Sequence, residues 1–258
     1  MKRRTILKLI IVLSIIILIF CGAKIISLNR EEYMNKQGYD KLQVLRSDTI
    51  VPDSIIIDLD YDGDNDMDPV REYLMDLYNI NHDFRGWLNI SDTTIDFPIV
   101  QGWPEDPEHY LHYDFYNAPN TFGCPFIAAG DTIEADNIVI YGHHFRNGNM
   151  FAPLDNYLDQ TWADDHRYIT LEALDKTHTY QVFCVFRMEV VDRPFHWDSS
   201  FLFPEEDDFN DFIANCNRYN EIETDFVPEY GDNFITLVTC NYSYSNGRLV
   251  IIACEYVT

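Results

Sequence analysis

Apolar residues alternate with polar ones in short runs along most of the chain. Eight such runs, rich in Val, Ile, Phe and Tyr and separated by turn-forming residues, read GWLNI, IDFPIV, CPFIAA, NIVIYGH, YITLEA, TYQVFCVFRMEVV, NFITLVTC and RLVIIACEYV. A period of two is typical of strands that bury one face. Many short strands with turns between them favour a closed or nearly closed barrel. We therefore expect a mainly β domain of the α+β class.

Two other segments have the apolar spacing of helices. Asp68 followed by Pro69 is a helix start signal, and the apolar stripe beyond it predicts an amphipathic helix that ends at about Ile80. The segment PEEDDFNDFIANCNRY, residues 204–219, places apolar residues at helical spacing behind an acidic first turn. This second helix falls between two late strands, and we expect its Cys216 to face the core.

The N-terminus combines a basic cluster with a long apolar stretch. At about 1.5 Å per residue, positions 5–28 are long enough to cross about 30 Å of hydrocarbon, with Lys8 and Lys24 at the two interfaces. The basic cluster is expected to stay in the cytoplasm, and no small-residue cleavage site follows the apolar stretch. We expect a cytoplasmic tail at 1–4 and an uncleaved transmembrane signal anchor at 5–28; a processed signal peptide is the alternative.

The remainder of the chain is strongly acidic. Residues 1–30 hold six of the 18 Lys+Arg and none of the 43 Asp+Glu, which leaves 12 basic and 43 acidic residues beyond them, a net charge near −31. Such a charge excludes nucleic acid as a partner and suits a solvated domain outside the membrane. Residues 29–67 are polar and acidic and are expected to form an extracytoplasmic stalk, followed by a folded domain at 68–258.

Two groups of residues raise the question of a metal. The run DLDYDG places Asp58, Asp60 and Asp62 at alternate positions, as at the start of a calcium-binding loop. A Pro stands where that loop needs a bidentate Glu, so a solvated acidic linker is the favoured interpretation and weak calcium binding the alternative. His109 and His112 have no further ligands at suitable spacing, so packing or surface roles are expected. No metal and no cofactor is predicted.

The six cysteines show no CxxC pair and no regular spacing. Cys21 lies in the apolar N-terminal segment, so five remain and a complete disulfide framework is impossible. Cys124, Cys184 and Cys254 lie in apolar strands and are expected to be buried, inert thiols. Cys240 instead ends the run ITLVTC, where a side chain can reach an open site at the end of a strand.

Two other side chains could support chemistry at Cys240. The Asn-Gly pair just before Arg248 is a strong hairpin signal, and a hairpin would return Arg248 beside the sulfur or beside an oxyanion formed there. The run NIVIYGHH ends in His143 and His144, and a histidine at a strand end can exchange protons with an amine at neutral pH. Neighbouring strand positions point in opposite directions. We therefore expect His144 to be packed or hydrogen-bonded outside the site.

These motifs together resemble the sortases, membrane-anchored cysteine transpeptidases of Gram-positive bacteria. The resemblance rests on TLVTC followed by NGRLVI, on YGHH upstream and on the basic-then-apolar N-terminus. It narrows to class B over about residues 70–258, through INHDFRGWLNI, FPIVQG, YLHYDFY, NIVIYGHHFRNGNMFAPLDNY and the long helix before TLVTC. It implies an eight-stranded sortase-like β-barrel with an N-terminal helix and a long helix inserted before the strand that bears Cys240.

The resemblance also implies a chemistry. Cys240 would be the nucleophile, His143 the general acid and base, and Arg248 the stabiliser of substrate and oxyanion. In the family, the cysteine cleaves a C-terminal sorting signal after Thr, and an amine of the cell-wall peptide resolves the thioester. The backbone N–H of Asn241 would donate to the oxyanion. The positions that match the signal-peptide groove are Leu111, Tyr141, Val238 and Thr239.

The implied enzyme is a single-pass membrane protein with an extracellular catalytic domain and no cofactor. Its partners would be surface proteins that carry a sorting signal and a peptidoglycan precursor or cross-bridge amine. One alternative is a pilin-polymerising sortase, which the absence of a lid-like segment before the domain disfavours. The other is a non-catalytic, acidic, membrane-tethered calcium-binding or adhesion module in which Cys240 is merely buried.

Overall fold

The computed structural model describes residues 2–49, 69–191, 195–198, 203, 205–243 and 246–256. The chain forms two compact units, Met1–Val44 and Leu45–Thr258. The weak calcium candidates, Asp58, Asp60 and Asp62, lie outside the described residues.

A single helix, α1 (Lys2–Thr49), contains the apolar N-terminal stretch. Its segment Leu7–Arg46 is long and apolar enough to cross a membrane, with a mean hydropathy of 3.0 over an 18-residue window. The apolar side chains of this window are exposed, as Phe20 is at 73%. Burial in hydrocarbon would remove this surface from water, so the helix is compatible with a membrane anchor. The polar segment from Asn29 onward continues the same helix.

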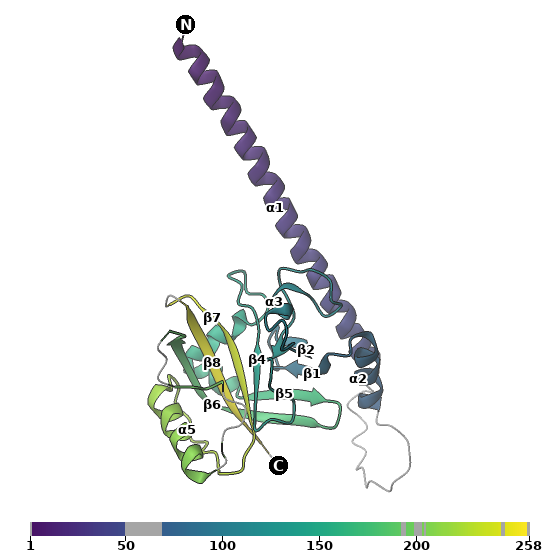
Figure 1. Ribbon diagram of the computed structural model, residues 1–258, viewed down its shortest axis with the longest axis vertical. Coiled ribbons are helices and arrows are strands. Elements are labelled where there is room, and N and C mark those ends of the chain that lie inside the picture. Colours follow the sequence, from purple (N-terminus) through teal and green to yellow (C-terminus); the bar gives the residue numbers. More distant parts are fainter. Residues whose placement is uncertain are drawn as a thin grey trace. The chain divides into compact units, whose positions relative to one another are not determined.

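Eight strands close a barrel in the order β1-β2-β3-β4-β7-β8-β6-β5 (Figure 1). Their bounds are β1 (Phe84–Asn89), β2 (Asp96–Gln101), β3 (Phe126–Ile127), β4 (Asn137–Tyr141), β5 (Tyr168–Ala173), β6 (Thr177–Glu189), β7 (Phe234–Asn241) and β8 (Gly247–Glu255). Neighbouring strands are antiparallel except in the pairs β2–β3 and β4–β7. Each strand coincides with one of the eight alternating runs, so the predicted barrel is confirmed. Closure gives each of these strands a neighbouring strand on both sides.

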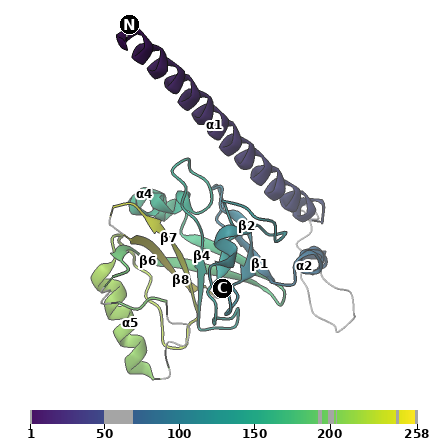
Figure 2. The ribbon, with the colours of Figure 1, turned by 45° about the horizontal axis from the view of Figure 1, so that its top comes forward.

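The helices lie outside the barrel. They are α2 (Pro69–Ile80), α3 (His109–His112), the 3₁₀ helix η1 (Ala152–Leu158), α4 (Gln160–Asp165) and α5 (Glu206–Tyr219). Both expected helices of the domain, at about 69–80 and 204–219, are therefore confirmed. Figure 2 shows α5 alongside β6, where it buries Phe209, Phe212 and Cys216 against residues of the barrel. Because α5 covers this side, strands β6, β7 and β8 are buried on both faces along most of their length.

The last residues of α1, from Leu45 onward, belong to the same compact unit as the barrel. There Arg46 forms ion pairs with Asp96 at 2.7 Å and with Glu172 at 2.6 Å, on β2 and β5. Its guanidinium carbon also lies 5.5 Å from the ring centroid of Trp87, whose indole N–H donates to Asp96. The Tyr73 hydroxyl of α2 donates to Glu172. One cation thus joins the end of α1 to two strands of the barrel.

Candidate active site

Cys240 and Arg248 face each other across the β7–β8 ladder. They are direct partners in the antiparallel register, and such partners project to the same face of a sheet. Asn246, just before β8, has a left-handed φ of 58°, as the turn residues of many hairpins do. The expected return of Arg248 beside Cys240 is therefore observed. β7 ends at Asn241 and β8 begins at Gly247, so the connection is longer than the Asn-Gly pair alone indicated.

The guanidinium of Arg248 has no carboxylate partner among the residues that the structure describes. Its recorded side-chain hydrogen bond runs from Nη1 to the Gly247 carbonyl at 3.0 Å. A half-buried guanidinium that makes this one hydrogen bond can still donate most of its N–H groups to a ligand.

Exposure separates Cys240 from the other cysteines that follow α1. Cys240 is half-buried, whereas Cys124, Cys184, Cys216 and Cys254 are buried. Burial raises the pKa of the Cys184 and Cys254 thiols, and a hydrogen bond and the charge of Asp232 add to the effect at Cys254. Such thiols stay protonated and are poor nucleophiles. The expected burial of all four is confirmed.

The parallel pairing of β4 with β7 brings a histidine to the same end of the barrel. Tyr141 at the end of β4 is the partner of Val238 in β7. The next residue, Gly142, donates its N–H to the Val238 carbonyl at 3.1 Å, so the chain that carries His143 leaves β4 beside the part of β7 that leads to Cys240.

Hydrogen bonds on both sides of this pair fix the alignment. Before the cysteine, Thr239 Oγ1 donates to the Gly142 carbonyl at 2.7 Å. After it, the Tyr242 hydroxyl donates to the His144 carbonyl at 2.9 Å. The residues that flank the candidate cysteine are thus bonded to the residues that flank the candidate histidine.

The ring of His143 is held in one tautomer. Its Nε2 lies 2.8 Å from the Leu111 carbonyl. Because a carbonyl only accepts, Nε2 carries the hydrogen and Nδ1 of the neutral ring carries the lone pair. Burial lowers the pKa of His143, the bond to Leu111 opposes this effect, and the nearby His112 adds to it. The ring is therefore neutral near pH 7 and can accept a proton at Nδ1.

His144 lies outside the candidate site, as expected from strand alternation. Its Nε2 is 2.7 Å from Asp155 Oδ2 in η1. Its ring packs edge-on against Tyr242, with centroids 5.1 Å apart.

The two upstream histidines have packing and surface positions, as expected. His109 is buried between the rings of Trp103 and Tyr113, at centroid distances of 3.8 Å and 4.2 Å, and Asn117 Oδ1 lies 2.8 Å from its Nε2. His112 is exposed. Within the described residues, no group of three or more His, Cys, Asp or Glu side chains could hold a metal ion.

The remaining candidate residues differ in exposure. Leu111 and Tyr141 are half-buried and can contact a ligand, whereas the side chains of Val238 and Thr239 are buried, at 1% and 2% exposure. The Asn241 side chain accepts the Ser243 N–H at 2.9 Å, which turns the backbone directly after Cys240.

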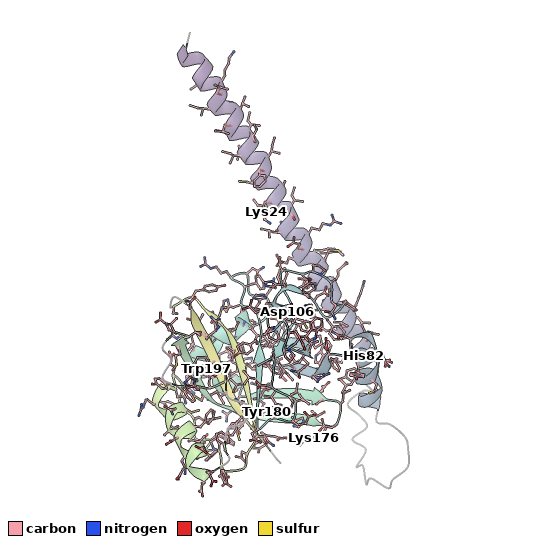
Figure 3. All side chains as sticks on the ribbon, in the orientation of Figure 1. Lys24, His82, Asp106, Lys176, Tyr180 and Trp197 are labelled. Atoms are coloured by element: carbon pink, nitrogen blue, oxygen red, sulfur yellow. The ribbon has the colours of Figure 1, made fainter. Side chains whose placement is uncertain are left out.

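A cavity of about 850 Å³ opens at the opposite end of the barrel. The β7–β8 ladder distinguishes the two ends. Phe234 pairs with Cys254 near the cavity, whereas Cys240 pairs with Arg248 at the candidate site. None of the candidate catalytic residues lines this cavity; its walls include Arg85, Gln101, His178, Tyr180, Asn233 and Glu255. Figure 3 labels Tyr180 at this end, together with Lys176 between β5 and β6. The volume of this cavity therefore does not identify the candidate active site.

Comparison with known proteins identifies the family. The sortase domain matches residues 88–255, so the chain belongs to the sortase family of enzymes. Sortase B of Listeria monocytogenes is 33% identical over 186 residues, which are 70% of this chain and 73% of that protein. Sortase B of Clostridium perfringens, an X-ray structure, is 30% identical with a TM-score of 0.65 over 71% of this chain and 99% of that one.

A further sortase B structure, in complex with triglycine, is 25% identical with a TM-score of 0.71 over 88% of this chain and 98% of that one. Together these relatives place the chain in class B, and its function is that of a sortase transpeptidase.

Sequence reasoning did not find two parts of this site. The Leu111 backbone carbonyl contacts His143, and a backbone contact leaves no signal in residue type. Tyr242 was also missed, although an aromatic residue two positions after Cys240 is visible in the sequence. Only the fold brings it to His144.

Proposed function

We propose that this class B sortase cleaves a C-terminal sorting signal after Thr, holds the acyl part as a thioester on Cys240, and transfers it to an amine of the peptidoglycan. The observation that carries the proposal is the strand register, in which Cys240 pairs with Arg248 and the β4–β7 alignment leads to His143. A sulfur nucleophile, a proton carrier and a cation are the three groups that acyl transfer through a thioester needs.

In the first half-reaction, Cys240 Sγ attacks the carbonyl carbon of the Thr residue. His143 Nδ1 takes the thiol proton and gives it to the departing amine as the C–N bond breaks, which leaves the thioester. A neutral ring suits this role because it can accept a proton, and burial lowers the pKa of His143 so that the charged form gives the proton up readily.

Negative charge develops on the carbonyl oxygen during the attack. Arg248 would stabilise this oxyanion and bind the signal peptide, and its lack of a carboxylate partner among the described residues supports the assignment. The Asn241 N–H would be a second donor. The exposed parts of Leu111 and Tyr141, with Val238 and Thr239 behind them, would border the groove for the signal peptide.

In the second half-reaction, an amine attacks the thioester carbon and the C–S bond breaks; His143 takes the proton of the amine and gives it to the departing sulfur, which restores the thiol of Cys240. The sortase B that was determined with triglycine supports an amine acceptor of the cell-wall type. The partners would thus be surface proteins with a sorting signal and a peptidoglycan precursor or cross-bridge amine.

We also propose that α1 anchors the enzyme in the membrane. Residues 1–4 would be cytoplasmic, 5–28 transmembrane, 29–67 an extracytoplasmic stalk, and 68–258 the extracellular catalytic domain. The exposed apolar surface of α1 and its length support the anchor.

The test uses the full-length enzyme in detergent and a panel of Thr-containing sorting peptides, with mass spectrometry to detect an acyl adduct. The adduct should form on Cys240, and Cys240→Ala should abolish both adduct and cleavage while circular dichroism stays unchanged. Cys21→Ser is the matched control, because it removes an exposed thiol outside the barrel. Retained cleavage in a folded Cys240→Ala variant would overturn the proposal.

A further inference from the structure

We propose that Tyr242 is a positioning residue: it binds the loop after Cys240 to the loop that carries His143 and so sets the geometry of the catalytic pair. The inference rests on the roles proposed above for Cys240 and His143. The described contacts of Tyr242 are with His144 and Arg146 and not with Cys240 or His143, so Tyr242 would act through these neighbours.

Tyr242 makes three contacts with one short segment of chain. Its hydroxyl donates to the His144 carbonyl at 2.9 Å. Its ring packs edge-on against the His144 ring, at an interplanar angle of 81°, and the Arg146 guanidinium carbon lies 4.9 Å from its centroid. Although the Tyr242 side chain is 56% exposed, both its hydroxyl and its ring therefore have partners. We call Tyr242, His144 and Arg146 the tyrosine clasp.

The surface that the clasp grips is itself held in place. Asp155, in η1, is 2.7 Å from His144 Nε2, which fixes the ring against which Tyr242 packs. The His143 carbonyl accepts the Phe151 N–H at 2.9 Å, and Phe151 is fully buried. The loop that carries His143 and His144 is therefore bonded to the packed interior at several points. Through the clasp, this rigid loop also restrains the residues that follow Cys240.

The loop after Cys240 depends more strongly on the clasp than the loop that carries His143 does. Thr239 bonds the chain before the cysteine to the Gly142 carbonyl, but Thr239 lies in β7 and not in the loop that follows it. Among the loop residues that the structure describes, the other side-chain tie to a different element is the contact of Ser243 Oγ with Arg187 Nη1, at a longer distance of 3.4 Å. Loss of the Tyr242 hydroxyl would thus free the backbone directly after Asn241, the proposed oxyanion donor, which itself pairs with Gly247 in the β7–β8 ladder.

The expected effect is on the chemical step rather than on binding. A displacement of about 1 Å between reacting groups can cost up to about 100-fold in rate. Tyr242→Phe removes one hydrogen bond and keeps the ring, so we expect kcat to fall about tenfold while KM changes by less than about twofold. Tyr242→Leu, which also removes the ring, should lower kcat further.

The experiment measures kcat and KM of the full-length enzyme in detergent on a sorting peptide, with kcat expressed per alkylatable Cys240 thiol. Tyr230→Phe is the matched control, because Tyr230 is also exposed, at 48%, and its hydroxyl also donates to a backbone carbonyl, that of Phe203 at 3.3 Å. Tyr230→Phe should keep wild-type kcat. The clasp is refuted if Tyr242→Phe keeps wild-type kcat per thiol, or if Tyr230→Phe loses as much.

A double-mutant cycle distinguishes positioning from a general loss of stability. Arg146→Met should lower kcat in the wild-type background and have little effect in the Tyr242→Leu background, because Arg146 acts through the ring. Equal losses in both backgrounds would contradict the clasp.

The variant Cys240→Ala separates the proposed function from the proposed clasp. Activity in that variant would refute the proposed function, whereas an inactive Cys240→Ala with a fully active Tyr242→Phe refutes the clasp alone.

Discussion

The hydroxyl of Thr239 donates to the carbonyl of Gly142 at 2.7 Å, across 97 residues of sequence. Both groups are buried, so the bond is protected from water. It joins the residue just before Cys240 to the residue just before His143, and it therefore locks the register on which the proposed active site depends.

Removal of this bond should cost both stability and activity. Thr239→Val keeps the shape but leaves the buried Gly142 carbonyl without this donor, which costs about 1–3 kcal/mol in the free energy of unfolding. Urea denaturation of the detergent-solubilised protein measures the loss, and kcat should fall with it. Thr239→Ser keeps the hydroxyl and should stay close to wild type. A Val variant as stable and active as the Ser variant would contradict this role.

The glycine before His143 should not tolerate a side chain. A Cβ at Gly142 would lie 2.5 Å from the Phe151 ring, far inside contact distance. Gly142→Ala should therefore destabilise the domain by about 1–3 kcal/mol through overpacking and displace His143, with loss of peptide cleavage. Phe151→Leu in the same chain makes room and should restore part of the activity. If Gly142→Ala alone melts at the wild-type temperature, the loop accommodates the added Cβ without loss of stability and the prediction is wrong.

Thiol labelling should distinguish the cysteines by exposure. In the folded full-length protein, iodoacetamide should modify Cys240, because Cys124, Cys184, Cys216 and Cys254 are buried and Cys21 lies in the proposed transmembrane segment. The variant Cys21→Ser should then take up one label, which peptide mapping locates at Cys240. In urea all remaining thiols should react. Labelling of a buried cysteine as fast as Cys240 under native conditions would disagree with the structure.

The lowered pKa of His143 gives a signed pH dependence. Burial is its main cause, so the folded protein binds this proton less readily than the unfolded chain, whose histidine titrates near 6.5. The contribution to stability is complete above about pH 6.5 and is lost as the pH falls below it. Urea unfolding at about pH 7.5 and pH 5.5 should show a smaller acid loss for His143→Gln than for wild type. NMR titration of the ring should give a midpoint below 6.5, and a midpoint above that value would contradict the stated cause.

Arg46 should contribute to the stability of the barrel unit although it lies far from Cys240 in sequence. Its side chain is 17% exposed and neutralises Asp96 and Glu172, which are 22% and 16% exposed. Arg46→Met leaves two half-buried carboxylates without this cation, and we expect a loss of about 1–3 kcal/mol, less than for fully buried pairs. Adding Asp96→Asn and Glu172→Gln should recover part of it. If the triple variant is no more stable than Arg46→Met, the ion pairs are not the cause.

Local pattern in the sequence determined the elements of this protein. Alternation identified all eight strands, because a strand buried on one face must repeat every two residues. Helical spacing and start signals identified α2 and α5 for the corresponding reason. The pairing of Cys240 with Arg248 was also predictable, since a hairpin joins neighbouring strands and the Asn-Gly pair indicates the turn. The resemblance to sortases added the histidine and the family.

The tertiary structure alone decided which distant elements meet. Periodicity reports that a residue is buried but not which strand lies beside it, so the parallel pairing of β4 with β7 has no local signal. The same holds for the tie between Thr239 and Gly142, the Leu111 carbonyl at His143, the clasp of Tyr242 and the ion pairs of Arg46. Each joins groups far apart in the chain, and their partners are fixed only when the barrel closes and brings the ends of its strands together.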